Sequence, residues 1–353
     1  MIKVLTLNEA KDWTNYLKRL PIQLQDIYYT PEYYSIYEKS GYGKAHCFVQ
    51  SIGEMVLIYP FLINEIKICN TNLKEQYYDI QGAYGYNGVL SNSKDIHFIN
   101  TYIENFRDYC TKNNVIAEFT RFNPILQNEL IPSQLEIVYD QENIVLDLKL
   151  ENIENNEYEH STRKNIKKAL RSGLEYITFC GGDITNEYFE YFYEIYNDTM
   201  DRNNADDFYY FTRDYFHNII SSIPHNCKFY FVTQNSKVIS TELVLYGECI
   251  AYSFLGGTLS NYFEFRPNDF LKDVIIKDLV NEGKEYFCLG GGPDGVIRYK
   301  KTFAKNGTHK FYFGKKIHNQ EIYNKIINIW EIENPISSKI HSNKVLRYYS
   351  HDR

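Results

Sequence analysis

Apolar positions in the first half of the chain recur with two different periods. Between residues 94 and 112, Ile96, Ile99, Ile103 and Phe106 follow one another at steps of three or four, which is typical of an amphipathic helix. Thr30 before Pro31 is a typical helix start, and a further helix is expected near Asn8. Short apolar runs predict strands at residues 44–50, 54–62, 115–119, 135–139 and 143–148.

The second half repeats this alternation of helices and strands. A basic helix is expected at residues 161–173, and the last helix starts from His318 and is followed by an irregular tail. Between them, helices are predicted from residues 184 and 212 and at 268–281, and strands at 174–179, 228–233, 238–246, 249–255, 286–289 and 310–316.

Both halves run from helices through strands to a long helix, a short apolar strand, a loop and closing strands. Residues 150–160 are polar and suit a linker, and 353 residues are enough for two domains. We therefore predict two domains, 1–150 and 151–353, the second ending in a helical tail. The expected class is α/β or α+β, with a mixed sheet flanked by helices in each domain.

Composition narrows the possible functions. Hydrophobic residues make up 44% and charged residues 24%, as in a soluble globular protein, and no apolar run approaches a membrane span. The net charge of -7 excludes a uniformly basic protein, so we expect no DNA partner. The N-terminus does not resemble a signal peptide. The seven cysteines form no C-x-x-C pair, which argues against a metal site and a disulfide framework and favours the cytoplasm.

Two acid-free basic segments stand out in this acidic chain. S-T-R-K-N-I-K-K-A-L-R-S-G, residues 161–173, holds five cations, and R-Y-K-K-T-F-A-K-N-G-T-H-K-F-Y-F-G-K-K, residues 298–316, holds seven. Cations in the first turn of a helix oppose its dipole, and a bound phosphate would explain Arg163, Lys164 and Lys167 there. The alternative is a solvated basic face. If the two segments meet, they would attract a phosphorylated ligand.

Two further motifs follow strands. L-G-G-G-P-D-G, residues 289–295, allows a ligand to approach the backbone closely, or it is a plain tight turn. F-R-P-N-D-F-L, residues 265–271, opens a helix whose free N–H groups suit an anion beside Arg266 and Asn268, although Asn268 is equally a plain cap. Glu242, in the middle of a strand, is a candidate base or ligand anchor, or it points to solvent. The chain has no G-x-S-x-G motif.

In this order the motifs resemble those of the Fem-type aminoacyltransferases (FemABX), within the GNAT-like acyltransferase superfamily. The resemblance spans most of the chain. It rests on P-E-Y-Y-S-I-Y-E at Pro31, Y-G-Y-N-G at Tyr84, R-F-N-P at Arg121, V-L-D-L at Val145, S-T-R-K-N-I-K-K-A at Ser161, I-Y-N-D-T-M-D-R-N-N-A at Ile195, F-Y-Y-F at Phe208, S-F-L-G-G-T at Ser253, R-P-N-D-F-L at Arg266, and L-G-G-G followed by Y-K-K-T-F at Tyr299.

The resemblance implies two GNAT-like domains that transfer an aminoacyl group from tRNA, or an acyl group from coenzyme A, to an amine. It implies a small-molecule or lipid-linked amine acceptor and no tightly bound cofactor or metal. Lys300, after Tyr299, is then expected to stabilise the oxyanion that forms on the attacked carbonyl. We expect acceptor contacts from four residues: Tyr84, Tyr86, Tyr209 and Arg213.

Two departures from the family leave the donor open. The segment N-Y-F-E-F-R-P-N-D lacks the glycines with which coenzyme A-binding GNATs hold pyrophosphate, and no coiled-coil insertion of the kind linked to tRNA binding is present. Two alternatives therefore stay open: an acyl-CoA-dependent N-acyltransferase acting on a nucleotide-sugar or surface glycan, and a catalytically silent module that binds a nucleotide-sugar or RNA.

Overall fold

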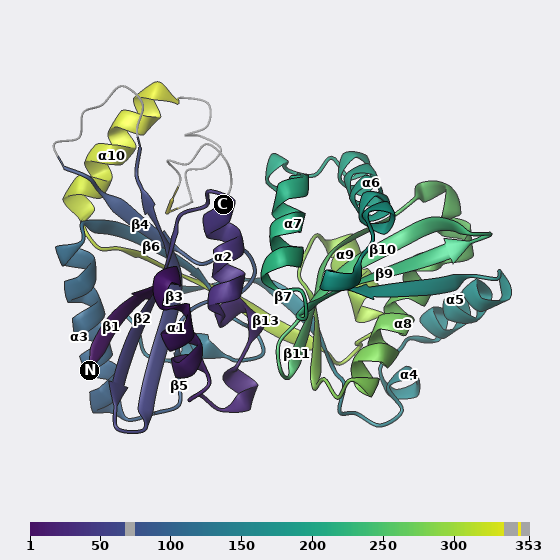
Figure 1. The fold of residues 1–353 in the computed structure, drawn as a ribbon, viewed down its shortest axis with the longest axis horizontal. Coiled ribbons are helices and arrows are strands. Elements are labelled where there is room, and N and C mark those ends of the chain that lie inside the picture. The colour runs from purple at the N-terminus through teal and green to yellow at the C-terminus, as the bar shows by residue number, and fades with distance from the viewer. Residues whose placement is uncertain (68–74, 335–344, 347–353) are drawn as a thin grey trace. The chain divides into compact units, whose positions relative to one another are not determined.

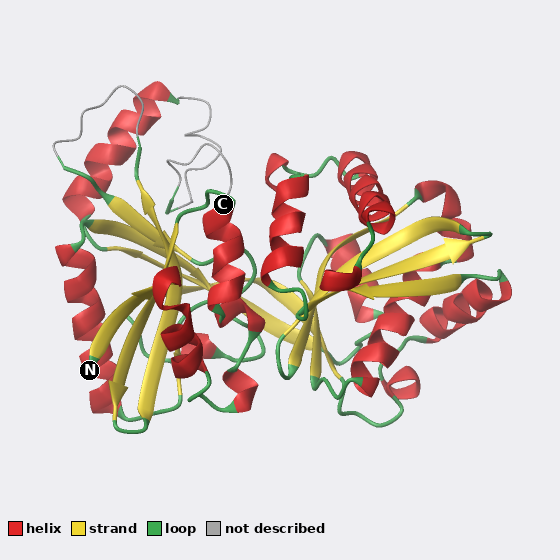
Figure 2. Cartoon of the chain, in the orientation of Figure 1, coloured by secondary structure: helices red, strands yellow, loops and turns green. Residues whose placement is uncertain are grey.

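The computed structural model describes residues 1–67, 75–334 and 345–346, and these form two compact units (Figures 1 and 2). Unit 1 comprises residues 1–24 and 28–140 together with the chain from residue 311 onward. Unit 2 comprises residues 25–27 and 141–310. The chain therefore leaves unit 1 at residue 140 and returns to it at residue 311.

Unit 1 contains a mixed sheet with helices on both faces. In chain order its elements are β1 (Ile2–Thr6), α1 (Ala10–Leu17), α2 (Pro31–Lys39), β2 (Lys44–Ile52), β3 (Met55–Glu65), β4 (Tyr78–Gln81), β5 (Leu90–Ser91), α3 (Ile96–Lys112), β6 (Val115–Arg121), the start of β7 (Glu136–Asp147), most of β13 (Thr308–Ile317) and α10 (Gln320–Glu333). The strand order is β1-β2-β3-β4-β6-β13, and β5 pairs with β3.

The alternation of side chains along β3 explains why helices cover both faces of this sheet. Tyr59 and Phe61 belong to one hydrophobic cluster with Phe106 of α3. Pro60, between them, faces the other way, and its carbonyl accepts a hydrogen bond of 2.9 Å from Tyr34 of α2. A period of two thus places α3 on one face and α2 on the other.

Unit 2 also contains a mixed sheet. Its elements are the remainder of β7, α4 (Ile153–Asn156), α5 (His160–Arg171), β8 (Glu175–Cys180), α6 (Asn186–Arg202), α7 (Arg213–Ser222), β9 (Cys227–Gln234), β10 (Lys237–Tyr246), β11 (Ile250–Thr258), α8 (Pro267–Asn281), β12 (Tyr286–Gly290), α9 (Asp294–Lys301) and the start of β13. The strand order is β7-β12-β11-β10-β9-β8.

Strand β9 shows how helices cover both faces of the strands in unit 2. Phe229 packs edge-on against Phe192 of α6, with ring centroids 5.0 Å apart. Tyr230, the next residue, points to the opposite face, where it joins a hydrophobic cluster with Ile275 of α8. Helices α6 and α8 therefore lie on opposite faces of the strands (Figure 1).

The two units share one topological pattern. In unit 1 the antiparallel strands β2, β3 and β4 are followed by α3 and then by β6, which pairs in parallel with β4. In unit 2 the antiparallel strands β9, β10 and β11 are followed by α8 and then by β12, which pairs in parallel with β11. The repeated order of elements in the sequence therefore reflects a repeated fold.

The structure corrects the predicted boundary and several elements. The chain after residue 310 belongs to unit 1 and not to the second domain, because β13 pairs with β6 and α10 packs on β6. The two strands predicted at 135–139 and 143–148 are the single strand β7. Strands β1 and β4 were not predicted, and most of the predicted irregular tail lies outside the described residues.

Candidate active site

Lys300 lies in the last turn of α9. This helix begins directly after the glycine-rich turn that follows β12. Its Nζ donates a hydrogen bond of 2.6 Å to the carbonyl of Gly291 in that turn. Burial, followed by the charge of Lys272, lowers the pKa of Lys300 to about 8. The neighbouring Lys301 forms an ion pair of 2.7 Å with Glu142. The glycine-rich turn thus holds the Lys300 amine, whereas the Lys301 amine pairs with Glu142 of β7.

Lys272 is a buried cation that the motifs did not indicate. It lies in α8, and its Nζ donates to both carboxylate oxygens of Glu242, at 2.6 and 2.7 Å, and to Oγ of Ser253 at 3.0 Å. Ser253 also donates to Glu242 at 2.6 Å. The Glu242 carboxylate is therefore fully engaged, which leaves it poorly placed to act as the free base that the sequence suggested.

A hollow of about 280 Å³ opens within unit 2. It is lined by residues of α5, of the segment that enters α8, and of the end of α9: Ser161, Thr162, Asn165, Phe263, Arg266, Pro267, Asn268, Asp269, Tyr299 and Thr302. Thr162 Oγ1 donates to the carbonyl of Thr302 at 3.1 Å, which joins α5 to the end of α9. The two basic segments of the sequence therefore meet here, although through polar side chains and not through their cations.

The start of α8 forms one wall of the hollow. Arg266 precedes the helix with φ at +61°, and no side chain caps the first turn. Instead, Oδ1 of Asn268 accepts hydrogen bonds from Ser240, at 3.2 Å, and from Thr258. Asn268 therefore ties α8 to β10 and β11. Pro267 has no N–H group and the N–H of Phe270 donates to the Arg266 carbonyl, so the N–H of Asn268 is the one that the start of the helix can offer to a ligand.

The basic face of α5 contributes less to the site than its sequence suggested. The guanidinium of Arg163 donates to the backbone carbonyls of Glu154, at 3.0 Å, and Tyr158, at 2.9 Å. Lys164 and Lys167 are exposed and do not line the hollow. Arg163 thus fixes the chain before α5, and phosphate binding by these three residues stays a prediction.

The four expected acceptor contacts are split between the units. Tyr84 and Tyr86 lie in unit 1, where the Tyr84 carbonyl accepts a hydrogen bond from Tyr33 and the Tyr86 ring packs against Phe311. In unit 2, Tyr209 is exposed and Arg213 forms an ion pair of 2.8 Å with Glu190. Their contact with an acceptor stays a prediction.

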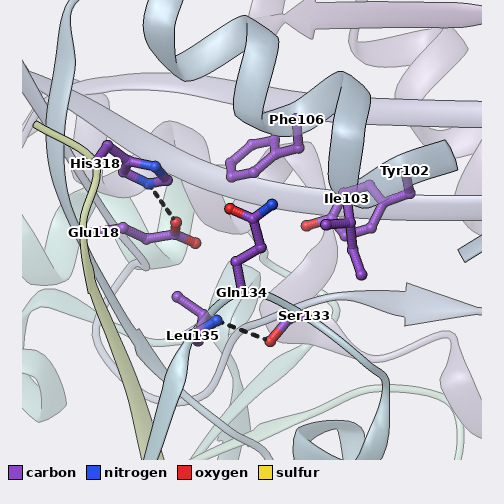
Figure 3. Close-up of a pocket in the computed structure, with 8 residues that line it drawn as sticks. All are labelled: Tyr102, Ile103, Phe106, Glu118, Ser133, Gln134, Leu135 and His318. Atoms are coloured by element: carbon purple, nitrogen blue, oxygen red, sulfur yellow. Dashed lines mark hydrogen bonds and ion pairs between the residues drawn. The ribbon is translucent and has the colours of Figure 1, made fainter. Parts of the chain in front are cut away.

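Unit 1 contains a small cavity of its own, of about 20 Å³, between α3, β6 and the end of β13 (Figure 3). His318 and Glu118 line it, and their Nε2 and Oε2 atoms lie 2.9 Å apart. The other oxygen of Glu118 accepts a hydrogen bond of 2.7 Å from Tyr59. The volume suits a water molecule rather than a substrate, so we regard this pair as part of the architecture of unit 1.

The comparisons with known proteins place the second unit in a family. Residues 160–301 match the family model described as an acetyltransferase (GNAT) domain. That range runs from the start of α5 to the end of α9 and contains Glu242, Lys272 and Lys300. Among curated proteins, none matches the sequence of the chain.

Solved structures extend the likeness to the whole chain. A crystal structure of FemX has a TM-score of 0.65 at 14% identity, over 92% of this chain and 99% of that one. The C-terminal domain of a putative lysylphosphatidylglycerol synthetase from Agrobacterium fabrum has a TM-score of 0.53 at 13% identity, over 94% and 96%. A tandem GNAT protein from the clavulanic acid biosynthesis pathway has a TM-score of 0.52 at 8% identity, over 90% and 99%.

These matches define the class of protein. Residues 160–301 form a GNAT domain, and the chain is an acyltransferase. Its two-unit fold is that of the FemABX type, as the sequence motifs predicted. Within the described residues, no helix is long and apolar enough to cross a membrane, and no group of three or more potential metal ligands comes together.

Proposed function

We propose that the protein transfers an acyl or aminoacyl group from an activated donor to an amine of a cell-wall or glycan precursor. The observation that carries this proposal is the placement of Lys300. Its amine, half-buried and held by the Gly291 carbonyl, belongs to a matched GNAT domain and lies one residue from the Tyr299 side chain that lines the hollow.

The chemistry asked of this site is aminolysis of an ester or thioester. The acceptor amine attacks the acyl carbon, the carbonyl oxygen becomes an oxyanion, and the tetrahedral intermediate collapses with loss of the donor's alcohol or thiol. An ammonium near the developing oxyanion stabilises it more than it stabilises the ground state. Lys300 supplies such an ammonium below pH 8, because its pKa is about 8.

The hollow between α5 and α8 is the proposed donor site. The N–H group of Asn268 at the start of α8 and the exposed Arg266 suit a phosphate of the donor. Both donors keep their place in the proposal: aminoacyl-tRNA, as the resemblance of the sequence motifs to the FemABX enzymes implies, and acyl-CoA, as GNAT domains use. Because both donors and nucleotide-linked acceptors occur in the cytoplasm, we propose that the protein acts there.

The test is a transfer assay with labelled donors. The purified protein is incubated with tRNA charged with labelled amino acids, or with labelled acetyl-CoA, and with a nucleotide-linked muropeptide that carries a free amine. Label is expected in the acceptor and is expected to be lost in Lys300→Met. If label moves from acetyl-CoA to an amino sugar nucleotide instead, the hypothesis of a glycan N-acyltransferase replaces that of an enzyme acting on cell-wall precursors. If no pair of substrates transfers label, the silent binding module is favoured.

A further inference from the structure

One buried carboxylate faces the hollow of unit 2 and has no role in the mechanism above. Asp269 stands in the first turn of α8 with only 6% of its surface exposed, and it lines the hollow. Its Oδ1 accepts a hydrogen bond of 3.1 Å from Asn165 of α5. The helix dipole stabilises an acidic side chain in the first turn whether that side chain is exposed or buried. The dipole therefore does not explain why this carboxylate is buried.

Burial of Asp269 has an energetic cost, which appears as a raised pKa of its carboxyl group. Burial is the main cause that raises the pKa of Asp269, whereas the hydrogen bond from Asn165, the charge of Arg266 and a hydrogen bond from its own backbone N–H lower it. Within the described residues, no cation lies within ion-pair distance of Asp269. A buried carboxylate is costly unless a cation or further donors accompany it.

The Tyr299 hydroxyl is an unsatisfied polar group that lines the same hollow. It is buried and has no hydrogen-bond partner among the described residues. Burial, with the charge of Asp269 as the next contribution, raises its pKa well above the usual value. The Tyr299 hydroxyl, which can donate or accept, and the Asp269 carboxylate, which only accepts, therefore line the same hollow.

We propose that Asp269 and Tyr299 form a subsite for a primary ammonium group of the substrate, with Arg266 beside it for an accompanying anion. An ammonium has three donors and a positive charge, so it would satisfy the Tyr299 oxygen and the Asp269 carboxylate together. A ligand bearing an ammonium next to an anionic group is the class that such a lining selects. The proposal rests on the proposed acyl-transfer function and refines its substrate class.

Two parts of the reaction could supply this ammonium: the α-amino group of an aminoacyl donor, or an amine of the acceptor. Both exclude a plain acetyl or fatty acyl group as the moiety recognised here. The volume of about 280 Å³ lies near the lower end of ligand sites, which suits an amino acid residue.

The experiment is calorimetric binding of two matched pairs of probes to the full chain. The donor pair is 3′-(L-alanylamino)-3′-deoxyadenosine and its N-acetyl form. The acceptor pair is a lysine-containing muropeptide and its Nε-acetyl form. In one pair we expect the free amine to bind at least about 10-fold more tightly, as for a hydrogen-bonded charge. The pair that shows this preference identifies the source of the ammonium.

The preference is expected to disappear in Asp269→Asn and to weaken in Tyr299→Phe. Glu264→Gln is the matched control, because Glu264 is exposed and lies outside the hollow. Asp269→Asn keeps an oxygen that can accept from Asn165, and a thermal melt checks that it folds. Equal binding of free and acetylated probes in both pairs, or a preference that survives Asp269→Asn, overturns the proposal.

The outcome is separable from that of the transfer assay. A chain that binds free amines through Asp269 but transfers nothing refutes the acyl-transfer function and leaves the subsite intact. A chain that transfers acyl groups yet binds free and acetylated probes equally refutes only the subsite.

Discussion

Lys272 donates hydrogen bonds of 2.6 and 2.7 Å to the two carboxylate oxygens of Glu242, and both side chains are about nine-tenths buried. Such a pair is costly to disrupt one partner at a time, because the remaining charge stays buried. The ion pair joins α8 to β10, and Ser253 of β11 forms hydrogen bonds with both side chains. It also places a fixed positive charge close enough to Lys300 to lower its pKa.

Glu242→Gln is therefore expected to lower the free energy of unfolding by about 3–5 kcal/mol, as for other buried pairs that lose one partner. Urea unfolding monitored by circular dichroism measures it. Glu142→Gln is the control, since its ion pair with Lys301 is about 40% exposed and is expected to contribute less than about 1 kcal/mol. Equal loss of stability in the two variants would contradict the buried-pair interpretation.

Lys300→Met is expected to lower kcat about 10²–10³-fold with little change in KM, since one oxyanion donor has that effect in comparable chemistry. The measurement is steady-state transfer with the substrates that the labelled-donor assay identifies. Lys301→Met is the control, because its amine pairs with Glu142. If Lys301→Met proves the damaging change, the assignment of the catalytic lysine is wrong. A raised KM with unchanged kcat would make Lys300 a binding residue.

The pH dependence of transfer follows from the same amine. Lys300 acts as an ammonium, so its contribution is complete well below pH 8 and is lost as the pH rises through about 8. Lys272→Met removes a neighbouring positive charge and is expected to move this fall in kcat to higher pH. A pH–rate profile of both proteins measures it. An unchanged profile would show that Lys272 does not influence the charge of Lys300.

Acetyl-CoA is expected to bind weakly or not at all, because the segment before α8 offers no glycine cradle. That segment is a short 3-10 helix, Ser260–Phe265, and bulky side chains occupy the positions from which converging N–H groups would be needed. Calorimetry with acetyl-CoA measures the affinity, and adenosine 3′,5′-bisphosphate serves as a phosphate control. Tight acetyl-CoA binding would overturn this prediction and favour the acyl-CoA-dependent reading.

In unit 1, His318→Phe is expected to destabilise the protein by about 1–3 kcal/mol. The change leaves one oxygen of buried Glu118 without the partner seen in Figure 3. The midpoint of thermal unfolding measures it, with His97→Phe as a control on the exposed face of α3. Similar midpoints for both variants would show that His318 does not stabilise Glu118.

Local patterns in the sequence predicted most of the helices and strands. Thr30 caps α2 through the N–H of Tyr33, as the Thr-Pro pair predicted, and the three- and four-residue spacing placed α3 within two residues. These features depend on neighbouring residues alone. The return of β13 to β6 was not predictable in the same way, because pairing across about 200 residues leaves no local pattern.

In the candidate site, too, local motifs were predictable and long-range contacts were not. Lys300 and Arg266 stand in motifs, and the structure places Lys300 at the glycine-rich turn and Arg266 at the hollow. Lys272 had a usable signal, because a lysine inside the apolar run of α8, a helix buried nearly all round, needs a counter-charge. Its partner Glu242 lies on strand β10, and only tertiary contacts reveal that pairing. The bonds of Arg163 to the backbone carbonyls of Glu154 and Tyr158 could not be read from the sequence either, and phosphate binding by Arg163 stays a prediction.

The insertion of unit 2 into unit 1 has a consequence for synthesis on the ribosome. Residues 141–310 emerge before residues 311–317, the part of β13 that pairs with β6 in unit 1. A nascent chain can therefore complete unit 2 while the backbone of β6 still has an unpaired edge, which is a template for intermolecular pairing. Premature termination near residue 310 would release a chain with a folded GNAT domain attached to an aggregation-prone unit 1, so quality control of this protein depends on β13.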